Sequence, residues 1–293
     1  MIPCQNYKRL YDGYVTYYFH PQFSSFDLSV IRGPGAGFGN LLFPLARALG
    51  YARTHKGILV EPTWRNLKLG PFLRFERDKR TYGNLFVHRS LSQIFGDIGR
   101  RSLTRRRITE EIFLNDFTAG TSCCTLVSIN GMRNRFRDIA GVGTVLREWL
   151  LTRIIICPKQ MQVPFVALHV RLGDFGPALD SYKRNTRIEF EWFRDEAIRV
   201  NKLLGEMPIY VFSDEDCPRL RSVLDGIPNI KFLKPVNAAH DLLYMSNAQH
   251  IIASNSTFSL WAAFIGTGTI SSRFGELFTD YGLDDPDFIQ RIC

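Results

Sequence analysis

Short apolar runs alternate with longer amphipathic segments throughout the second half of the chain. Residues 165–170, Phe-Val-Ala-Leu-His-Val, are almost continuously apolar, as expected of a parallel strand covered on both faces. A capping box at 186–189 predicts a helix that runs to Leu204 and ends at Gly205. Further strands are predicted at 209–212, 230–233 and 250–253, and helices at 218–224, 238–245 and 257–265. This alternation predicts an α/β fold with a doubly wound parallel sheet.

The first half of the chain contains a glycine-rich turn between a predicted strand at 27–32 and a predicted helix at 41–55. Asn40 is expected to cap that helix, with Pro44 in its first turn. The turn includes Gly37, Gly39 and Asn40, whose backbone can cradle a phosphate or a sugar, although a merely tight turn explains the glycines equally well. The spacing matches neither GxGxxG nor the P-loop.

Two other regions mark the beginning and the end of the expected first domain. The first 26 residues are aromatic and irregular, which predicts a packed N-terminal arm without assigned chemistry. Prolines at 158 and 164 interrupt the pattern after a predicted helix at 144–156. A length of 293 residues favours two domains, so we expect one domain at 1–160 and another at 161–293.

Composition narrows the class of partner. With 45% hydrophobic and 22% charged residues and a formal charge of +9, the chain is expected to be globular and to bind anions such as nucleotides or an acidic membrane surface. No apolar run or leader pattern predicts a membrane span or signal peptide, so we expect a cytoplasmic protein. Six cysteines without paired CxxC spacing argue against structural zinc. The arginines at 100–107 predict a solvated loop or helix, or alternatively a nucleic-acid surface.

Polar residues follow three of the predicted strands at the edge of the sheet where α/β proteins bind ligands. His169 and Arg171 follow the first strand, the segment 213–216 follows the second, and the segment 254–257 follows the third. Arg171 presents a charged fork that suits a phosphate, although an ion pair with Asp174 is the alternative. The residues Asn255, Ser256 and Thr257 open a helix, where they bind phosphate, cap the helix, or do both.

Two of these residues have further interpretations. Asp214 can accept hydrogen bonds from a guanine, or it can cap the helix near Pro218. Asp214 and Asp216 also form a DxD pattern of the kind that binds a divalent ion with a nucleotide diphosphate. His169 lies among apolar residues, so a buried histidine with satisfied hydrogen bonds is the alternative to a ligand contact.

Four motifs resemble those of family 11 glycosyltransferases, the α-1,2-fucosyltransferases. Residues 37–43 resemble GxGNxxF, 169–174 resemble HxRRGD, 212–215 resemble FSDD and 254–263 resemble SNSTFSWWAA. They occur in the family's order. This chain departs from the motifs at Leu172, where the family has a second arginine, and at Glu215 and Leu260.

The resemblance implies a glycosyltransferase-B fold, in which two Rossmann-like doubly wound domains face each other. It implies an acceptor-side domain at 1–160 and a donor domain at 161–293. The implied reaction is an inverting transfer of L-fucose from GDP-β-L-fucose, without metal or other cofactor, to a hydroxyl such as the 2-OH of a galactoside. The acceptor would be a glycan or lipid-linked oligosaccharide, and peripheral association with a membrane surface would suit the charge.

The resemblance also implies residue roles. Arg171 would hold the β-phosphate, His169 and Asp214 would approach the guanine, Ser256 and Thr257 would bind phosphate, and the turn at 37–40 would face the donor. A general base is less defined: Asp180, Asp174 and Glu61 are candidates in that order, and the departing phosphate itself can take the proton. The competing hypotheses are a GDP-sugar transferase of other donor or linkage specificity and a basic nucleic-acid-binding protein.

Overall fold

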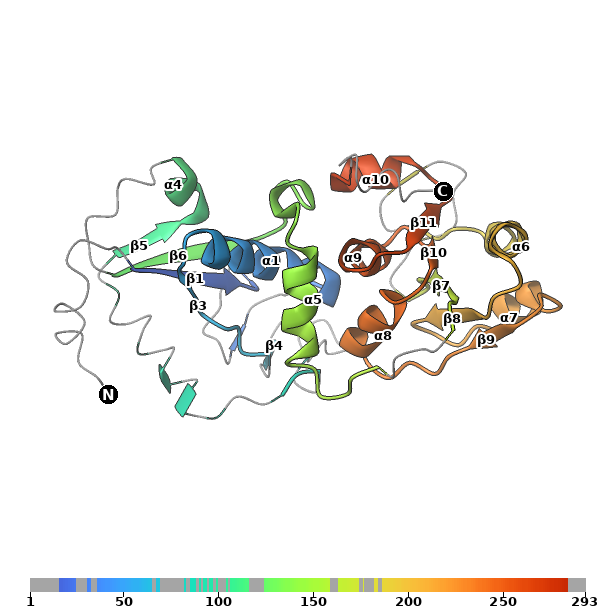
Figure 1. The fold of residues 1–293 in the computed structure, drawn as a ribbon, viewed down its shortest axis with the longest axis horizontal. Helices are drawn as coiled ribbons and strands as arrows, with labels where there is room; N and C mark the ends of the chain where they lie inside the picture. Colours follow the sequence, from blue (N-terminus) through green and yellow to red (C-terminus); the bar gives the residue numbers. More distant parts are fainter. Residues whose placement is uncertain are drawn as a thin grey trace. The chain divides into compact units, whose positions relative to one another are not determined.

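The structure is a computed structural model that describes residues 16–24, 31–32, 36–64, 67–68, 82, 85–87, 90, 92–93, 95–96, 99, 104, 106–115, 124–158, 163–173, 176, 182–183 and 186–283. The chain divides into two compact units (Figure 1). The first unit comprises Met1–Gly37, Leu41–Gly83 and His88–Met132, and the second comprises Phe38–Asn40, Asn84–Val87 and Arg133–Cys293.

The second unit is built on a five-stranded sheet in which every pair of neighbours is parallel. Its order is β11-β10-β7-β8-β9, so β7 lies at the centre between β10 and β8. Because the strands are parallel, their carboxyl ends meet at one edge of the sheet. The strands are β7 (Val166–Val170), β8 (Ile209–Ser213), β9 (Ile230–Phe232), β10 (His250–Ala253) and β11 (Thr269–Ser272).

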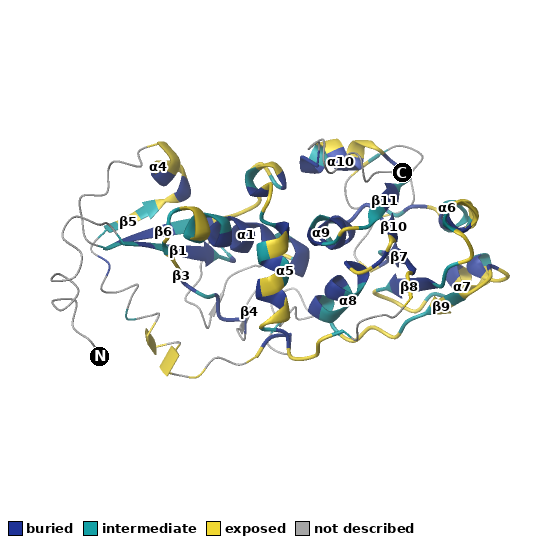
Figure 2. Ribbon diagram, viewed as in Figure 1, coloured by how far each residue is buried: buried dark blue, intermediate teal, exposed yellow. Residues whose placement is uncertain are grey.

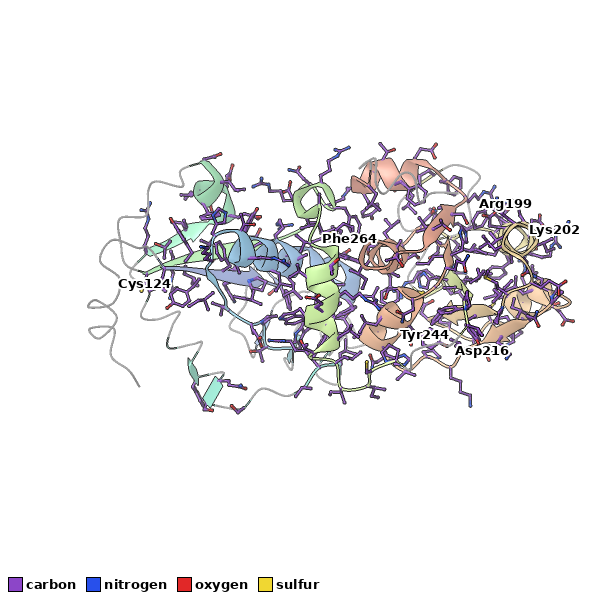
Figure 3. All side chains as sticks on the ribbon, in the orientation of Figure 1. Cys124, Arg199, Lys202, Asp216, Tyr244 and Phe264 are labelled. Atoms are coloured by element: carbon purple, nitrogen blue, oxygen red, sulfur yellow. The ribbon has the colours of Figure 1, made fainter. Side chains whose placement is uncertain are left out.

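Alternating side chains of β7 and β8 pack against different helices, which shows that this sheet is covered on both faces. Val166, Leu168 and Val170 join an apolar cluster with residues of α6 (Phe190–Leu204) and α7 (Pro218–Leu224). On the opposite face, Phe165 and Tyr210 contact Tyr244 of α8 (Ala238–Met245), which Figure 3 labels. Strands β7, β8 and β10 are almost entirely buried, and the outer helices keep exposed faces (Figure 2). The predicted doubly wound sheet is thereby confirmed.

Local sequence signals explain where the helices of this unit begin and end. Pro218 occupies the first turn of α7, where its missing N–H breaks no helical bond. Asn237 caps α8 by accepting from the backbone N–H of His240 at 2.8 Å. Gly205 follows α6 with a φ of 76°, a conformation that favours glycine. The other helices are α5 (Gly143–Leu151), α9 (Thr257–Ile265) and α10 (Glu276–Tyr281), with a 3-10 turn η4 (Arg137–Ile139).

The first unit contains a second parallel sheet, in the order β3-β1-β6-β5. Its core joins aromatic residues of β1 with Phe113 of α4 and Ala48 of α1. The strands are β1 (Thr16–Gln22), β3 (Ile58–Leu59), β5 (Arg106–Thr109) and β6 (Cys124–Asn130), and the helices are α1 (Phe38–Thr54) and α4 (Glu110–Asn115). A separate pair joins β2 (Ile31–Arg32) to β4 (Leu67–Lys68).

Several local predictions were wrong. The predicted N-terminal arm contains β1, an inner strand of the sheet. Helix α1 begins at Phe38, two residues before Asn40, and no side chain caps it. Pro44 therefore lies beyond the first turn. The predicted capping box fails because α6 begins at Phe190 and the hydroxyl of Thr186 donates to the carbonyl of Lys183 at 2.6 Å.

Two further observations concern the arginines at 100–107 and the possibility of a membrane-spanning helix. Arg106 and Arg107 lie in strand β5 and not in a loop or helix, while 100, 101 and 105 lie outside the described residues. None of the helices in the described part of the chain combines the length and the apolar character needed to cross a bilayer.

Candidate functional site

The turn after β7 is braced by the aspartate that follows β8. Asp214 accepts hydrogen bonds from the backbone N–H groups of Leu172 at 2.8 Å and Gly173 at 3.0 Å. It also forms an ion pair with Arg171, with 2.9 Å between Nη1 and Oδ2. The Arg171 side chain keeps 35% of its surface exposed, so the guanidinium is fixed at one edge and accessible at the carboxyl edge of the sheet.

Two further residues of this turn, Gly173 and Leu172, are explained by their surroundings. A Cβ atom on Gly173 would lie 2.7 Å from an Asp214 carboxylate oxygen, so only glycine allows this close approach. Leu172 is buried in the apolar cluster under β7, where the family motif has an arginine. Its carbonyl oxygen accepts from Nε and Nη2 of Arg187 at 3.1 and 2.9 Å.

His169 is a buried histidine that contacts two serines. Its Nδ1 lies 2.6 Å from the hydroxyl of Ser259 in α9 and 2.9 Å from that of Ser254. Burial lowers the pKa of His169 to about 4, while Asp214 opposes the shift and Arg171 adds to it. The imidazole is therefore neutral near pH 7. The two serine contacts of Nδ1 fit the alternative of a buried core histidine, and Phe258 packs beside the ring at 5.4 Å between centroids.

The segment after β10 opens helix α9 and is tied to the first turn of α1. The Ser256 hydroxyl caps α9 by accepting from the backbone N–H of Phe258 at 3.2 Å. The Thr257 hydroxyl donates to the Asn40 side chain at 3.1 Å, and the Trp261 indole N–H donates to the carbonyl of Gly39 at 2.6 Å. A Cβ atom on Gly39 would lie 2.9 Å from the Thr257 hydroxyl oxygen, which explains why glycine occupies this position.

Asn255 carries a buried acceptor without a partner. Its side-chain amide approaches the carbonyl of Thr186 at 3.5 Å, whereas its Oδ1 accepts no hydrogen bond in the part of the chain that the structure describes. The residue is only 4% exposed. Leaving a buried carbonyl oxygen unpaired is costly, so a donor group of a ligand is a natural partner for it.

The second aspartate of the DxD pattern contacts a different residue. Asp216, labelled in Figure 3, pairs with Arg221 of α7 at 2.7 Å. Among the described residues, no group of three or more His, Cys, Asp or Glu side chains is arranged to hold a metal ion. The α7 helix follows Cys217 without a side-chain cap, so the alternative role of Asp214 as its cap is wrong.

The structure brings most of the predicted site residues of the second unit together at one sheet edge. They are Gly39, Asn40, His169, Arg171, Asp214, Asn255, Ser256 and Thr257. Gly37 and Glu61 belong to the first unit. Asp174 and Asp180 lie outside the described residues. Sequence reasoning gave no role to Ser259, although it lies within the motif at 254–263, nor to Arg187, which it placed in a capping box.

The family model described as "Glycosyl transferase family 11" matches residues 145–272. This range holds three of the four motifs. One curated relative is an alpha-1,2-colitosyltransferase of Escherichia coli, 26% identical over 103 residues, which are 34% of this chain and 36% of the relative. The match thus spans about a third of the relative's length.

Solved structures show the fold. A structure of POFUT1 in complex with GDP-fucose is 12% identical, covers 90% of this chain and 99% of its own, and has a TM-score of 0.51. Another, of POFUT1 in complex with GDP, is 13% identical, covers 89% of this chain and 99% of its own, and has a TM-score of 0.50.

Two parallel α/β sheets in two units, together with this likeness, define the glycosyltransferase-B fold class that the sequence predicted. Within that class, residues 145–272 match the model of glycosyl transferase family 11. The resemblance that the motifs indicated is therefore confirmed.

Proposed function

We propose that the protein transfers L-fucose from GDP-β-L-fucose, with inversion, to a hydroxyl of a glycan or lipid-linked oligosaccharide. The 2-OH of a galactoside is the favoured acceptor group. The observation that carries the proposal is Arg171, a partly exposed guanidinium held by Asp214 at the carboxyl edge of the sheet in the part of the chain that matches family 11. A formal charge of +9 suits an acceptor presented at an acidic membrane face.

The proposed chemistry follows from where charge develops. The acceptor oxygen forms a bond to C1 of the fucose as the bond from C1 to the β-phosphate oxygen breaks, and the electron pair leaves with GDP. Negative charge grows on the β-phosphate while the sugar gains oxocarbenium character. A cation already fixed by Asp214 stabilises that charge without reorganising, and Ser256 and Thr257 with the amides of α9 act on the same group.

The acceptor proton requires a destination. Asp180, Asp174 and Glu61 remain the candidates for a general base, and transfer to the departing phosphate is the alternative. His169 is a poor candidate because its Nδ1 contacts two serines and its pKa is held at about 4. We assign His169 and Asp214 to the guanine side of the site. Gly37, Gly39 and Asn40, at the start of α1, are assigned to face the donor.

Asn255 extends the proposed donor site. Its buried Oδ1, unpaired among the described residues, can accept a hydrogen bond from an N–H or O–H group of the donor. Metal independence is part of the proposal because the aspartates of the DxD pattern are each engaged by an arginine. Asp214 pairs with Arg171 and Asp216 pairs with Arg221.

A second candidate function is transfer of colitose. The observation that favours it is the curated relative named alpha-1,2-colitosyltransferase. Colitose is L-fucose without the 3-hydroxyl group, so the two donors differ by one hydrogen-bonding group. A site that hydrogen-bonds this hydroxyl would reject the deoxy donor, whereas an apolar contact would accept both.

The decisive experiment measures donor hydrolysis and transfer with a panel of GDP-L-fucose, GDP-colitose and GDP-mannose. The proposal expects the highest kcat/KM with GDP-L-fucose and no change when a chelator is added. A preference for GDP-colitose would establish the second candidate. Loss of GDP binding in a calorimetric titration with chelator would contradict metal independence, and binding of random duplex DNA in place of GDP would contradict the enzyme hypothesis.

A further inference from the structure

Arg187 contacts the sheet edge between two of the loops that form the candidate site. Its guanidinium donates to the carbonyl of Leu172 after β7, and the carbonyl of the preceding residue, Thr186, receives the amide of Asn255 after β10. A bridge between Thr186 and Gly176 and a backbone hydrogen bond of 3.4 Å from Arg187 to Gly176 hold the segment. Because β7 and β10 are neighbours, the pair 186–187 spans the gap between their ends.

Among the described residues, no carboxylate pairs with the guanidinium of Arg187. Arg171 is paired with Asp214, so part of its charge is already compensated. Arg187 instead binds a neutral carbonyl oxygen, and within the described ranges of the chain it forms no ion pair. A diphosphate carries more negative charge than the Arg171–Asp214 pair can balance. Arg187 therefore supplies uncompensated positive charge beside this pair.

The guanidinium of Arg187 is also oriented. Two of its nitrogens, Nε and Nη2, are held by the Leu172 carbonyl, and the third, Nη1, has no partner among the described residues. A planar guanidinium fixed along one edge keeps a second edge for a bidentate contact, which is the geometry that suits phosphate oxygens.

The residue at position 172 leaves the turn after β7 without a second cation. In the family motif an arginine stands at this position, but here the side chain is buried among apolar residues of β7, α6 and α7. The cation that the motif would supply is absent from the turn itself. We propose that Arg187 replaces it and binds the diphosphate of the donor through its Nη1 edge. The inference rests on the proposed GDP-sugar site and adds a contact that no motif assigns.

The test compares the affinities of the full-length protein for GDP, GMP and guanosine by calorimetry. Arg187→Gln removes the charge and the fork, so the Kd for GDP should rise about tenfold to a hundredfold while the Kd for guanosine stays unchanged. Arg194→Gln is the matched control because Arg194 is a partly exposed arginine of α6 that pairs with its neighbour Asp195. It should bind all three ligands as the parent does.

The possible results separate the inference from the function on which it rests. GDP affinity within twofold of the parent's in Arg187→Gln overturns the role of Arg187 and leaves the proposed function intact. Equal losses for GDP and guanosine also overturn it, because a merely structural role would disturb the whole site. A parent protein that binds none of the three ligands defeats the proposed function and the inference with it. Should Arg187→Gln fail to fold, Arg187→Lys carries the test, and unchanged GDP affinity in that variant overturns the bidentate contact.

Discussion

Each unit places an arginine–carboxylate pair at the ends of two neighbouring parallel strands, but the two pairs differ in exposure. In the first unit, Arg47 of α1 contacts Glu110 after β5 at 2.7 Å and the carbonyls of Asn130 and Gly131 at the end of β6 at 2.6 and 2.9 Å. In the second unit, Arg171 after β7 contacts Asp214 after β8 at 2.9 Å. The side chain of Arg47 is fully buried, whereas that of Arg171 is 35% exposed.

This difference shows how the same pair of residue types serves two purposes. Arg47 donates its hydrogen bonds to oxygens of the protein, and the Tyr51 hydroxyl donates a further hydrogen bond of 2.9 Å to Glu110. The pair therefore joins helix α1 to the ends of β5 and β6. Arg171 is held by its aspartate yet remains accessible at a sheet edge. Burial and complete satisfaction therefore mark a structural pair, and partial exposure at the carboxyl edge marks a candidate ligand contact.

The largest expected effect is loss of stability in Arg47→Met. The substitution leaves Glu110 buried without its cation, so the free energy of unfolding should fall by about 3–5 kcal/mol in a denaturant titration. The double variant Arg47→Met/Glu110→Gln removes the uncompensated charge and should recover part of the loss. A single variant as stable as the parent would show that the pair does not hold the first unit together.

Arg171→Lys should affect turnover instead of folding. Lysine keeps the charge but loses the fork, so we expect the rate of fucose transfer to fall about a hundredfold or more, the cost of removing one oxyanion-type donor. Melting should stay close to that of the parent because the Arg171–Asp214 pair is partly exposed. Arg194→Lys is the control for a surface arginine. Transfer at the parent's rate in Arg171→Lys would remove Arg171 from the catalytic role.

The pH dependence of stability should reveal the buried histidine of the second unit. Folding lowers the pKa of His169 from its ordinary 6.5 to about 4 because the ring is buried. The unfolded chain therefore binds the proton more readily, and stability present above pH 6.5 is lost as the pH falls toward 4. Between about pH 7 and pH 5 the loss from His169 should be about 2 kcal/mol.

Denaturant titrations at several pH values measure this effect. His250, whose pKa burial also lowers to about 4, contributes a similar slope. His169→Gln should reduce the slope by roughly half, leaving the part due to His250. An unchanged slope in His169→Gln would mean that His169 titrates alike in the folded and unfolded chain.

The smallest expected effects belong to the start of α9. Ser256→Ala and Thr257→Ala each remove a neutral hydroxyl while backbone amides remain, so the Kd for GDP should rise about fivefold. Ser256→Ala should also lower stability by about 1 kcal/mol, because its hydroxyl caps the helix. If both variants bind GDP like the parent, this segment serves only to cap α9 and to contact Asn40.

The second unit could be predicted closely from sequence because its signals are local. The strand at 250–253 is a buried apolar run, and the helices at 218–224, 238–245 and 257–265 have the bounds that the pattern predicted. The strand Thr269–Ser272 was missed because it is short and largely polar. Strand β1 was missed because its residues Tyr18, His20 and Gln22 interrupt the apolar pattern, although pairing on both sides makes it central.

Within the site, sequence predicted which residues gather but not how they pair. Residues that end parallel strands must meet at one edge, so Arg171, Asp214 and Ser256 could be grouped without a structure. The partner of Arg171 depends on how the turns after β7 and β8 approach each other, and Asp214 is 43 residues from it in the chain. The predicted cap of α1 at Asn40 was wrong because the helix already includes Gly39. Glycine has a low helix propensity, but at this position its missing side chain allows the close approach of Thr257.

The contacts between the first turn of α1 and helix α9 bear on how the protein is synthesised and truncated. Residues 38–40 leave the ribosome more than two hundred residues before Thr257 and Trp261, the partners of Asn40 and Gly39. The second unit cannot complete its packing until almost the whole chain has been made, which exposes the early segment for a long time. A fragment that begins at residue 133 would leave the Trp261 indole N–H, buried in the intact protein, without its carbonyl partner. Residues 38–40 are thus needed by any shortened version of the second unit that is to keep this packing.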